Sequence, residues 1–249
     1  YDAGGTVTTG NNNIAIGNDA MNGAAVTADN IIAIGTSAGD ALTTGTANIM
    51  IGTNAGGSLN TAAGCTLVGT NAGDTITDGG YNTFIGDNAG QAMNSGANNT
   101  AVGYLAAYIT AGDYDTAIGR YASPVLTSGD YNTSLGANAG AVLTTGHGNT
   151  AIGYGATHSA TGATNETVIG SGSVAPSGGN SVTLGNASVT EIYCASDKGA
   201  TIYAAGAVLT GGINFPDTQN ASGDANTLDD YEEGTWTVTC TTTDVTIAT

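Results

Sequence analysis

Few residues of this 249-residue chain have types and spacings suited to catalysis. Asp113 and Asp115 form a pair of acids, and paired carboxylates carry out glycoside hydrolysis. His147 and His158 are the two histidines, and no Ser-His-Asp order around them has a supporting motif. A nucleophile elbow needs a strand-to-helix turn, and no helical period occurs. We therefore interpret Asp113 and Asp115 as turn acids and predict no enzymatic activity and no catalytic residue.

Cofactor and metal chemistry are equally poorly represented. Gly170-Ser171-Gly172 lies in a predicted turn, and a glycine-rich phosphate loop needs a following helix. Cys65, Cys194 and Cys240 are odd in number and irregular in spacing, which predicts neither a disulfide framework nor a zinc site. We expect three unpaired thiols from a reducing cytosol, no cofactor and no metal. Divalent-cation binding by Asp-rich turns is the alternative interpretation of the acidic residues.

Tyrosine is the one residue type that suggests recognition. Tyr81, Tyr114 and Tyr131 occupy equivalent positions before three predicted strands, and Tyr104, Tyr121 and Tyr154 follow such strands. Aromatic rings stack on sugars, so Tyr81, Tyr114 and Tyr131 are candidate glycan contacts. Packing between neighbouring coils is the competing explanation.

Composition and charge exclude several classes of function. Charged residues make up 9% of the chain and Arg120 and Lys198 are its only cations, giving a net charge of −18. A nucleic-acid partner needs clustered Lys and Arg, and anionic lipid would be repelled. No apolar run approaches the roughly 20 residues of a membrane span, and the N-terminus does not resemble a signal peptide. We expect no nucleic-acid partner and no membrane insertion.

An internal repeat dominates the sequence. Its unit reads approximately Asn-Thr-Ala-Ile-Gly-x-Asn-Ala-Gly-x-x-Leu-Thr-x-Gly-x-x, and most copies are 17 residues apart. Repeats of this length indicate a solenoid, in which each unit buries its apolar face against its neighbours. The glycine that closes the Ala-Ile-Gly-like triplet marks each copy. These marker glycines are Gly17, Gly35, Gly52, Gly69, Gly86, Gly103, Gly119, Gly136, Gly153, Gly170 and Gly185.

Three columns of residues before each marker define a strand. The residue directly before the marker is a branched aliphatic, from Ile16 to Leu184, and the residue three before it is β-branched, from Ile14 to Val182. We predict that both columns point into the coil. The column between them, from Ala15 to Thr183, is then predicted to face outward as an apolar stripe. Exposed apolar stripes mark interfaces, so Met50, Leu67, Phe84 and Val168 are the predicted oligomer interface, with Leu67 and Phe84 near a shared axis.

Other columns have turn chemistry. An asparagine precedes the strand in most copies, with Asp115 as its equivalent in one, and we interpret this column as side-chain caps that stack from coil to coil. Alanine recurs three residues after the marker, often followed by glycine. A second apolar column, which includes Leu42 and Leu143, is expected to close the core from the other side.

The predicted fold is all-β: a parallel β-solenoid or β-roll of about eleven 17-residue coils over residues 1–189. The period breaks after this array. We interpret residues 190–216 as a transition or neck segment and 217–233 as a polar linker. The alternation of Thr235 to Thr241 predicts the first strand of a truncated C-terminal β domain over residues 234–249.

The tandem Asn-Thr-Ala-Ile-Gly-x-x-Ala units resemble the YadA-like head repeat of trimeric adhesins, over roughly residues 6–190. The 17-residue period is longer than the 14 or so of the bacterial head repeat. The longer repeat and the later segment Leu228-Asp-Asp-Tyr-Glu-Glu-Gly-Thr-Trp236 together resemble tail-fibre-like proteins of environmental bacteriophages more than bacterial adhesins. The resemblance implies a left-handed β-roll whose chains assemble as a parallel homotrimer.

These observations favour a structural protein located in a virion: a bacteriophage tail-fibre shaft or head. Such a segment would present a tip for host attachment, and a host receptor or glycan would be its partner, engaged mainly beyond this chain. The alternative is a bacterial trimeric autotransporter adhesin head on the cell surface, binding host matrix or glycan. A third class is an ice-binding solenoid. It needs a flat outer array of threonines, and the prediction that the threonine column points inward counts against it.

Overall fold

A computed structural model describes residues 2–109 and 112–189, and all regular structure in these ranges is β-strand. Each strand is short and ends one residue before a marker glycine. The strands are β1 (Ile14–Ile16), β2 (Ile32–Ile34), β3 (Ile49–Ile51), β4 (Thr66–Val68), β5 (Thr83–Ile85), β6 (Thr100–Val102), β7 (Thr116–Ile118), β8 (Thr133–Leu135), β9 (Thr150–Ile152), β10 (Glu166–Ile169) and β11 (Ser181–Leu184).

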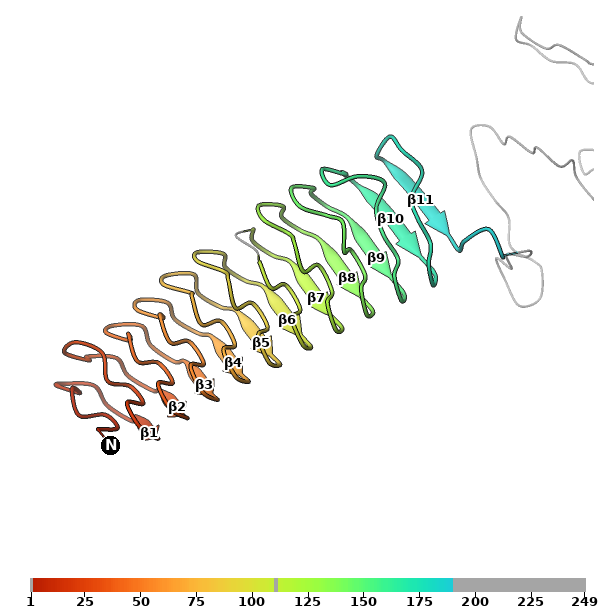
Figure 1. The fold of residues 1–249 in the computed structure, drawn as a ribbon. Coiled ribbons are helices and arrows are strands. Elements are labelled where there is room, and N and C mark those ends of the chain that lie inside the picture. Colours follow the sequence, from red (N-terminus) through yellow and green to blue (C-terminus); the bar gives the residue numbers. More distant parts are fainter. Residues whose placement is uncertain (1, 110–111, 190–249) are drawn as a thin grey trace, which may run out of the picture. The chain divides into compact units, whose positions relative to one another are not determined.

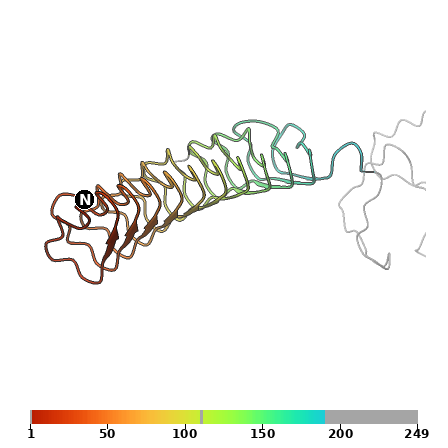
Figure 2. The same ribbon diagram turned by 60° about the horizontal axis from the view of Figure 1, so that its bottom comes forward.

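The strands form one sheet of eleven in sequence order, and every pair of neighbours is parallel. Figures 1 and 2 show consecutive coils stacked side by side, with all the strands on one side of the coil. The predicted parallel β-solenoid is therefore confirmed. At roughly 4.8 Å per strand, the stack is about 50 Å long. The predicted neck, linker and C-terminal strand at 190–249 lie outside the described residues.

The direction of the strand side chains is the reverse of the prediction. The middle column lies in the core: Met50, Leu67, Phe84 and Val168 are all completely buried within their own coil. The prediction that these four residues form an oligomer interface is therefore wrong. The columns on either side of them face outward, and Ile85 and Ile118 are 41% and 36% exposed.

The asparagine column explains this orientation. Asn48, Asn82, Asn99, Asn132 and Asn149 are buried, and each donates its side-chain Nδ2 to a turn carbonyl of the next coil. Each also accepts, through Oδ1, the backbone N–H of the equivalent residue one coil further on. These bonds need the amide inside the coil. Because strand side chains alternate, the residue two positions later must also point inward, and that residue belongs to the middle column.

The narrow interior is filled by complementary sizes. Against Met50, Leu67 and Phe84, a glycine faces the large side chain from the same coil or from the preceding one. A Cβ on Gly90 would lie 2.3 Å from the Phe84 ring, and a Cβ on Gly73 would lie 2.9 Å from Leu67. Where the middle residue is Ala101, the residue corresponding to Gly90 is Ala107, which is also buried. In these coils a bulky side chain on one side of the interior is matched by a small residue on the other, as close packing requires.

Marker glycines let the coils approach closely. Gly119 has φ 135°, and a Cβ there would lie 2.5 Å from the carbonyl oxygen of Gly136 on the next coil. The same contact recurs between successive markers from Gly17 to Gly153. Only glycine combines this positive φ with backbone contact at the corner, so the marker column is fixed by the stacking itself.

Candidate interaction surface

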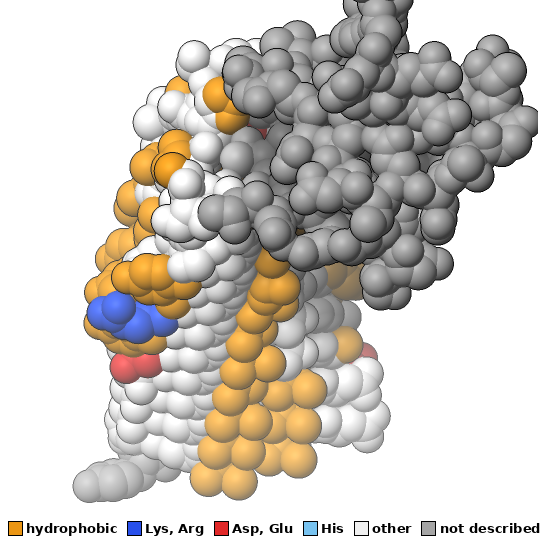
Figure 3. All heavy atoms as spheres, turned by 90° about the vertical axis from the view of Figure 1, so that its right-hand side faces the viewer, with side chains coloured by type: hydrophobic (Ala, Val, Ile, Leu, Met, Phe, Trp, Pro, Cys, Tyr) orange, Lys and Arg blue, Asp and Glu red, His pale blue; other side chains and the backbone are white. Residues whose placement is uncertain are grey.

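The outer face of the sheet is an aliphatic and threonine surface, which we call the outer stripe. It consists of the two outward columns, whose members carry no charge. Its aliphatic column is Ile16, Ile34, Ile51, Val68, Ile85, Val102, Ile118, Leu135, Ile152, Ile169 and Leu184. Its second column is Ile14, Ile32, Ile49, Thr66, Thr83, Thr100, Thr116, Thr133, Thr150, Thr167 and Val182. Figure 3 shows hydrophobic side chains running along this face as a continuous band.

The outer stripe is a contiguous surface that runs the length of the sheet. It is about 50 Å long, and its two columns are about 7 Å apart along each strand. Ile16, Leu135 and Leu184 are 57%, 43% and 48% exposed. Contiguous exposed apolar patches, unlike apolar side chains that are exposed singly, often mark contact surfaces. The sequence analysis expected an interface stripe on the middle column, which lies on the opposite face of the strand and is buried.

The predicted glycan contacts lie together at one corner of the coil. Tyr81, Tyr114 and Tyr131 occupy a column five residues before the marker and are 68%, 53% and 63% exposed. The rings of Tyr114 and Tyr131 stack in parallel, with centroids 5.1 Å apart and an interplanar angle of 3°. Tyr81 lies two coils before Tyr114 and packs over Gly64, where a Cβ would be 2.7 Å from its ring. The cross-coil packing considered from the sequence is thus present for Tyr114 and Tyr131.

This corner column has a left-handed backbone in every coil. Its φ values run from 49° at Asn180 to 71° at Gly64. Asparagine and glycine adopt this conformation readily, whereas a bulky residue there is strained. The column reads Asn12, Asn30, Ala47, Gly64, Tyr81, Asn98, Tyr114, Tyr131, Gly148, Asn165 and Asn180. Its tyrosines therefore depart from the residue types that the backbone prefers.

Tyr104, Tyr121 and Tyr154 lie at the opposite end of the strands. Tyr104 and Tyr121 meet edge to face with centroids 5.5 Å apart, and the Arg120 guanidinium lies 4.4 Å from the centre of the Tyr121 ring. Tyr154 is 65% exposed. Arg120 is the one Lys or Arg within residues 2–109 and 112–189, so the only described cation is held against an aromatic ring.

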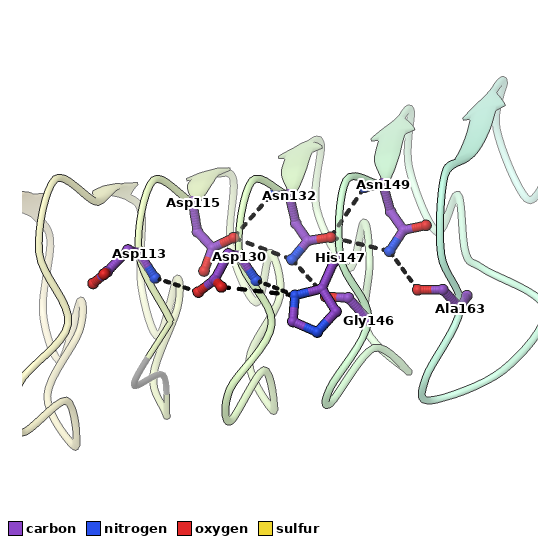
Figure 4. Close-up of polar contacts among 8 residues, drawn as sticks. All are labelled: Asp113, Asp115, Asp130, Asn132, Gly146, His147, Asn149 and Ala163. Carbon is purple, nitrogen blue, oxygen red and sulfur yellow. Dashed lines mark hydrogen bonds and ion pairs between the residues drawn. The ribbon is translucent and has the colours of Figure 1, made fainter.

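Asp115 replaces asparagine in one coil of the asparagine ladder (Figure 4). It is 3% exposed, and its Oδ1 accepts hydrogen bonds from the backbone and side chain of Asn132. Its Oδ2 stands where neighbouring coils have an amide nitrogen, and it has no partner. Burial raises the pKa of Asp115 to about 7, although the bonds from Asn132 oppose the shift. A protonated Oδ2 would supply the donor that asparagine supplies elsewhere.

Asp113 belongs to a second ladder on the outside of the same turns (Figure 4). The backbone N–H of Asp113 donates to Asp130 Oδ1 at 2.9 Å, and that of Asp130 donates to His147 Nδ1 at 3.1 Å. Asp113 and Asp115 therefore lie in separate ladders, one half-exposed and one buried, and each is engaged by backbone donors of a turn. No shared acid-base centre follows from this arrangement.

His158 and Glu166 form a buried pair that sequence reasoning missed. Glu166 stands in the asparagine column, is completely buried, and accepts hydrogen bonds from the backbone N–H and hydroxyl of Ser159. Burial raises the pKa of Glu166, but the Ser159 bonds outweigh it and hold the pKa below its ordinary value. His158 Nδ1 lies 3.7 Å from Glu166 Oε2. Burial lowers the pKa of His158 despite the nearby carboxylate. A glutamate in the asparagine column was the available signal.

Cys65 is a buried free thiol, and its burial raises its pKa; Cys194 and Cys240 lie outside the described residues. Within residues 2–109 and 112–189, His, Cys, Asp and Glu form no group of three that could hold a metal ion. The same ranges contain no helix long and apolar enough to cross a membrane.

Comparisons with known proteins leave the function open. No protein-family model matches the sequence, and no curated protein and no solved structure matches it significantly.

Proposed function

We propose that this chain is a structural segment of an extended surface fibre, a bacteriophage tail-fibre shaft or head that holds a receptor-binding tip away from its base. The proposal is supported by an eleven-stranded solenoid whose coils repeat with little variation. The resemblance of its repeat to YadA-like heads and phage fibres favours the same role. In such a segment length and stiffness serve the function, and no catalytic residue is required.

The observation that carries the proposal is the outer stripe. Its side chains are held out from the sheet by the alternation that puts the asparagine ladder inside. Burying an aliphatic side chain contributes about 1.5–3 kcal/mol in full, and these side chains are about half-exposed. The stripe lacks charge over its whole length although the chain carries −18. A partner aligned parallel to the solenoid would bury the outer stripe along its whole length.

We propose that the partner is another copy of the same chain, because its own outer stripe has the same length, the same spacing and the same lack of charge. Copies related by an axis along the solenoid bring equivalent coils to the same height. We propose three chains, as the family resemblance implies. Leu67 and Phe84 are buried within their own coils, so they do not form the proposed contact. The chains would instead meet through the outward columns that contain Ile118 and Thr116.

Native mass spectrometry of the full chain tests the assembly. We expect a trimeric mass for the wild-type protein and a monomeric mass for Ile118→Asp, with the β-sheet circular dichroism retained. Val142→Asp is the matched control, because Val142 is 39% exposed and Ile118 36%, but Val142 lies outside the stripe. A wild-type monomer, or dissociation by Val142→Asp but not by Ile118→Asp, would contradict the proposed interface.

A bacterial adhesin head is the alternative within the same architecture. The flanking gene sequence distinguishes the two: an outer-membrane anchor domain encoded downstream favours the adhesin, whereas a virion-attachment domain encoded upstream favours the tail fibre.

Ice binding is a second candidate, because one observation now favours it. Thr66, Thr83, Thr100, Thr116, Thr133, Thr150 and Thr167 face outward, contrary to the prediction that counted against this class. They form a regular column beside the aliphatic one. Thermal hysteresis of the wild-type protein, compared with Thr116→Tyr, tests this function. A trimer that covers the stripe and shows no hysteresis rules it out.

A further inference from the structure

The column of corner tyrosines ends at a gap. Gly148 follows Tyr131 in this column, one coil further on, and has the same left-handed backbone, with φ 66°. Coil-to-coil hydrogen bonds continue undisturbed on both sides, from Gly148 N–H to the Asp130 carbonyl and from Asn165 N–H to the His147 carbonyl. The backbone therefore keeps its course while one side chain is missing from the column.

The gap at Gly148 is open, unlike the gap at Gly64. Apart from its own chain neighbours, no residue has an atom within 4 Å of a Cβ placed on Gly148, whereas the Tyr81 ring fills the equivalent space over Gly64. The two flanking side chains, Tyr131 and Asn165, are two coils apart, or roughly 9–10 Å. A sugar ring in van der Waals contact on both faces needs about 7–8 Å. One pyranose ring therefore fits between them.

Groups around this gap suit a sugar. One face of Tyr131 is covered by Tyr114 and the other is turned toward Gly148's coil. In the asparagine copies of this column, Nδ2 of one coil donates to Oδ1 of the next, as in Asn12 to Asn30 and Asn165 to Asn180. Because Gly148 has no side chain, Asn165 Oδ1 lacks this ladder donor and is available to a hydroxyl group.

Polar side chains lie directly beside the gap. His147 precedes Gly148, and Asp130 precedes Tyr131; their side chains are 53% and 40% exposed. His147 Nδ1 accepts the Asp130 backbone N–H, so neutral His147 carries its proton on Nε2 and offers a donor. Asp130 and Asp113 add negative charge, as does the whole chain. A sialic or uronic acid would be repelled here, which favours a neutral sugar.

Strain supports a functional origin for Tyr131. A bulky side chain is strained in the left-handed region, which asparagine adopts more readily. The stack with Tyr114 offsets part of this strain, so stability gives little reason for tyrosine at 131. We infer that Tyr131, Gly148 and Asn165 form a binding site for one neutral pyranose ring, with His147 and Asp130 hydrogen-bonding to its hydroxyl groups.

Saturation-transfer NMR on the full chain tests this site. The probes are maltotriose, cellotriose and tri-N-acetylchitotriose as neutral sugars, trigalacturonate as an anionic sugar, and tetramethylammonium as a cation. We expect the ring protons of at least one neutral probe to take up saturation from the protein. Trigalacturonate should not, because the site is acidic. Tetramethylammonium should take up less saturation than the neutral sugar, because a single open ring face is not the cage of several rings that holds such a cation.

Two variants address the site without disturbing the fold. Tyr131→Asn removes the stacking face and Gly148→Asn fills the gap, and asparagine is the residue that this backbone favours. Each should weaken sugar binding about tenfold or more, the equivalent of about 1.4 kcal/mol. Tyr81→Asn is the matched control and should bind as the wild-type protein does, because no gap adjoins Tyr81.

Binding that survives both Tyr131→Asn and Gly148→Asn would overturn the site, as would the absence of saturation in every neutral probe. Preferential binding of tetramethylammonium or trigalacturonate would overturn the ligand class. The site lies within one chain, so these outcomes do not depend on the proposed trimer.

Discussion

At the scale of single residues, Asp115 is the position where the repeat departs most from its own chemistry. Five asparagines of the same column each donate one amide hydrogen to a turn carbonyl, and an ionised carboxylate cannot do so. Asp115 therefore introduces a titratable group into a ladder that is otherwise neutral up to Glu166. Its proton decides whether the ladder is complete at this coil.

Stability should depend on pH through this residue. Burial raises the folded-state pKa of Asp115 to about 7, from the 3.8 of an ordinary aspartate. The folded state thus holds the proton more tightly than the unfolded state, so the stabilisation is complete below about pH 4 and is lost as the pH rises through 7. We expect Asp115→Asn to exceed the wild-type protein in unfolding free energy by on the order of 2–4 kcal/mol at pH 8, and by little at pH 4.

Urea denaturation at both pH values measures this difference. Asp113→Asn is the control, since Asp113 lies two residues away but is half-exposed in the outer ladder. A gain in stability for Asp115→Asn that is the same at pH 4 and pH 8 would show that Asp115 is not the titrating group.

At the scale of the coil, interior volume couples residues six apart. Phe84 is accommodated because Gly90 has no side chain, and the next coil replaces this pair by Ala101 and Ala107. The strand pairing is the same in both coils, but one coil combines a large side chain with a glycine and the next combines two alanines. The sizes of the two residues in each pair are therefore coupled, and the pattern of hydrophobic residues along the sequence does not show this coupling.

A double-mutant cycle tests this coupling. Phe84→Ala should destabilise by about 3–5 kcal/mol through lost burial and a cavity. Gly90→Ala should also destabilise, because its Cβ would lie 2.3 Å from the ring and its φ of 59° is strained for alanine. In the double variant we expect Gly90→Ala to cost at least 1 kcal/mol less than it does alone. Strict additivity in thermal or urea unfolding would contradict the packing described here.

At the scale of the whole molecule, the solenoid is a stack in which each coil contacts its neighbours. Removing one complete unit should therefore preserve the columns. Deletion of residues 49–65 joins Asn48 to Thr66, so that β4 pairs with β2 in the register that β3 now uses. We expect the shortened chain to keep its circular dichroism and to melt cooperatively.

Deletion of residues 49–56 is the matched comparison, because it removes about half a coil and places turn residues where the strand should be. This variant should lose coil pairing around the deletion and become sensitive to limited proteolysis there. Equal protease resistance of the two deletions would mean that the column register does not govern the fold.

The sequence alone determined the period, the strand in each repeat, the parallel stacking and the class of fold. Those features follow from local residue types: β-branched residues alternate over a short segment, and glycine and asparagine recur at the corners. The corner tyrosines were also identified from the sequence as candidate sugar contacts, and that role stays a prediction.

Only the tertiary structure decided which face of the strand is inside. Both faces are apolar in this sequence, so hydrophobicity at a period of two did not distinguish them, and the bulkier column was assigned to the core. The deciding constraint is cross-coil: Asn132 must be buried to bond Gly146 and Asn149, and Ser134, two residues later, must follow it inward. The gap at Gly148 and the buried pair of His158 and Glu166 likewise depend on residues a whole coil or half a coil apart. Such contacts exist only once the coils are stacked.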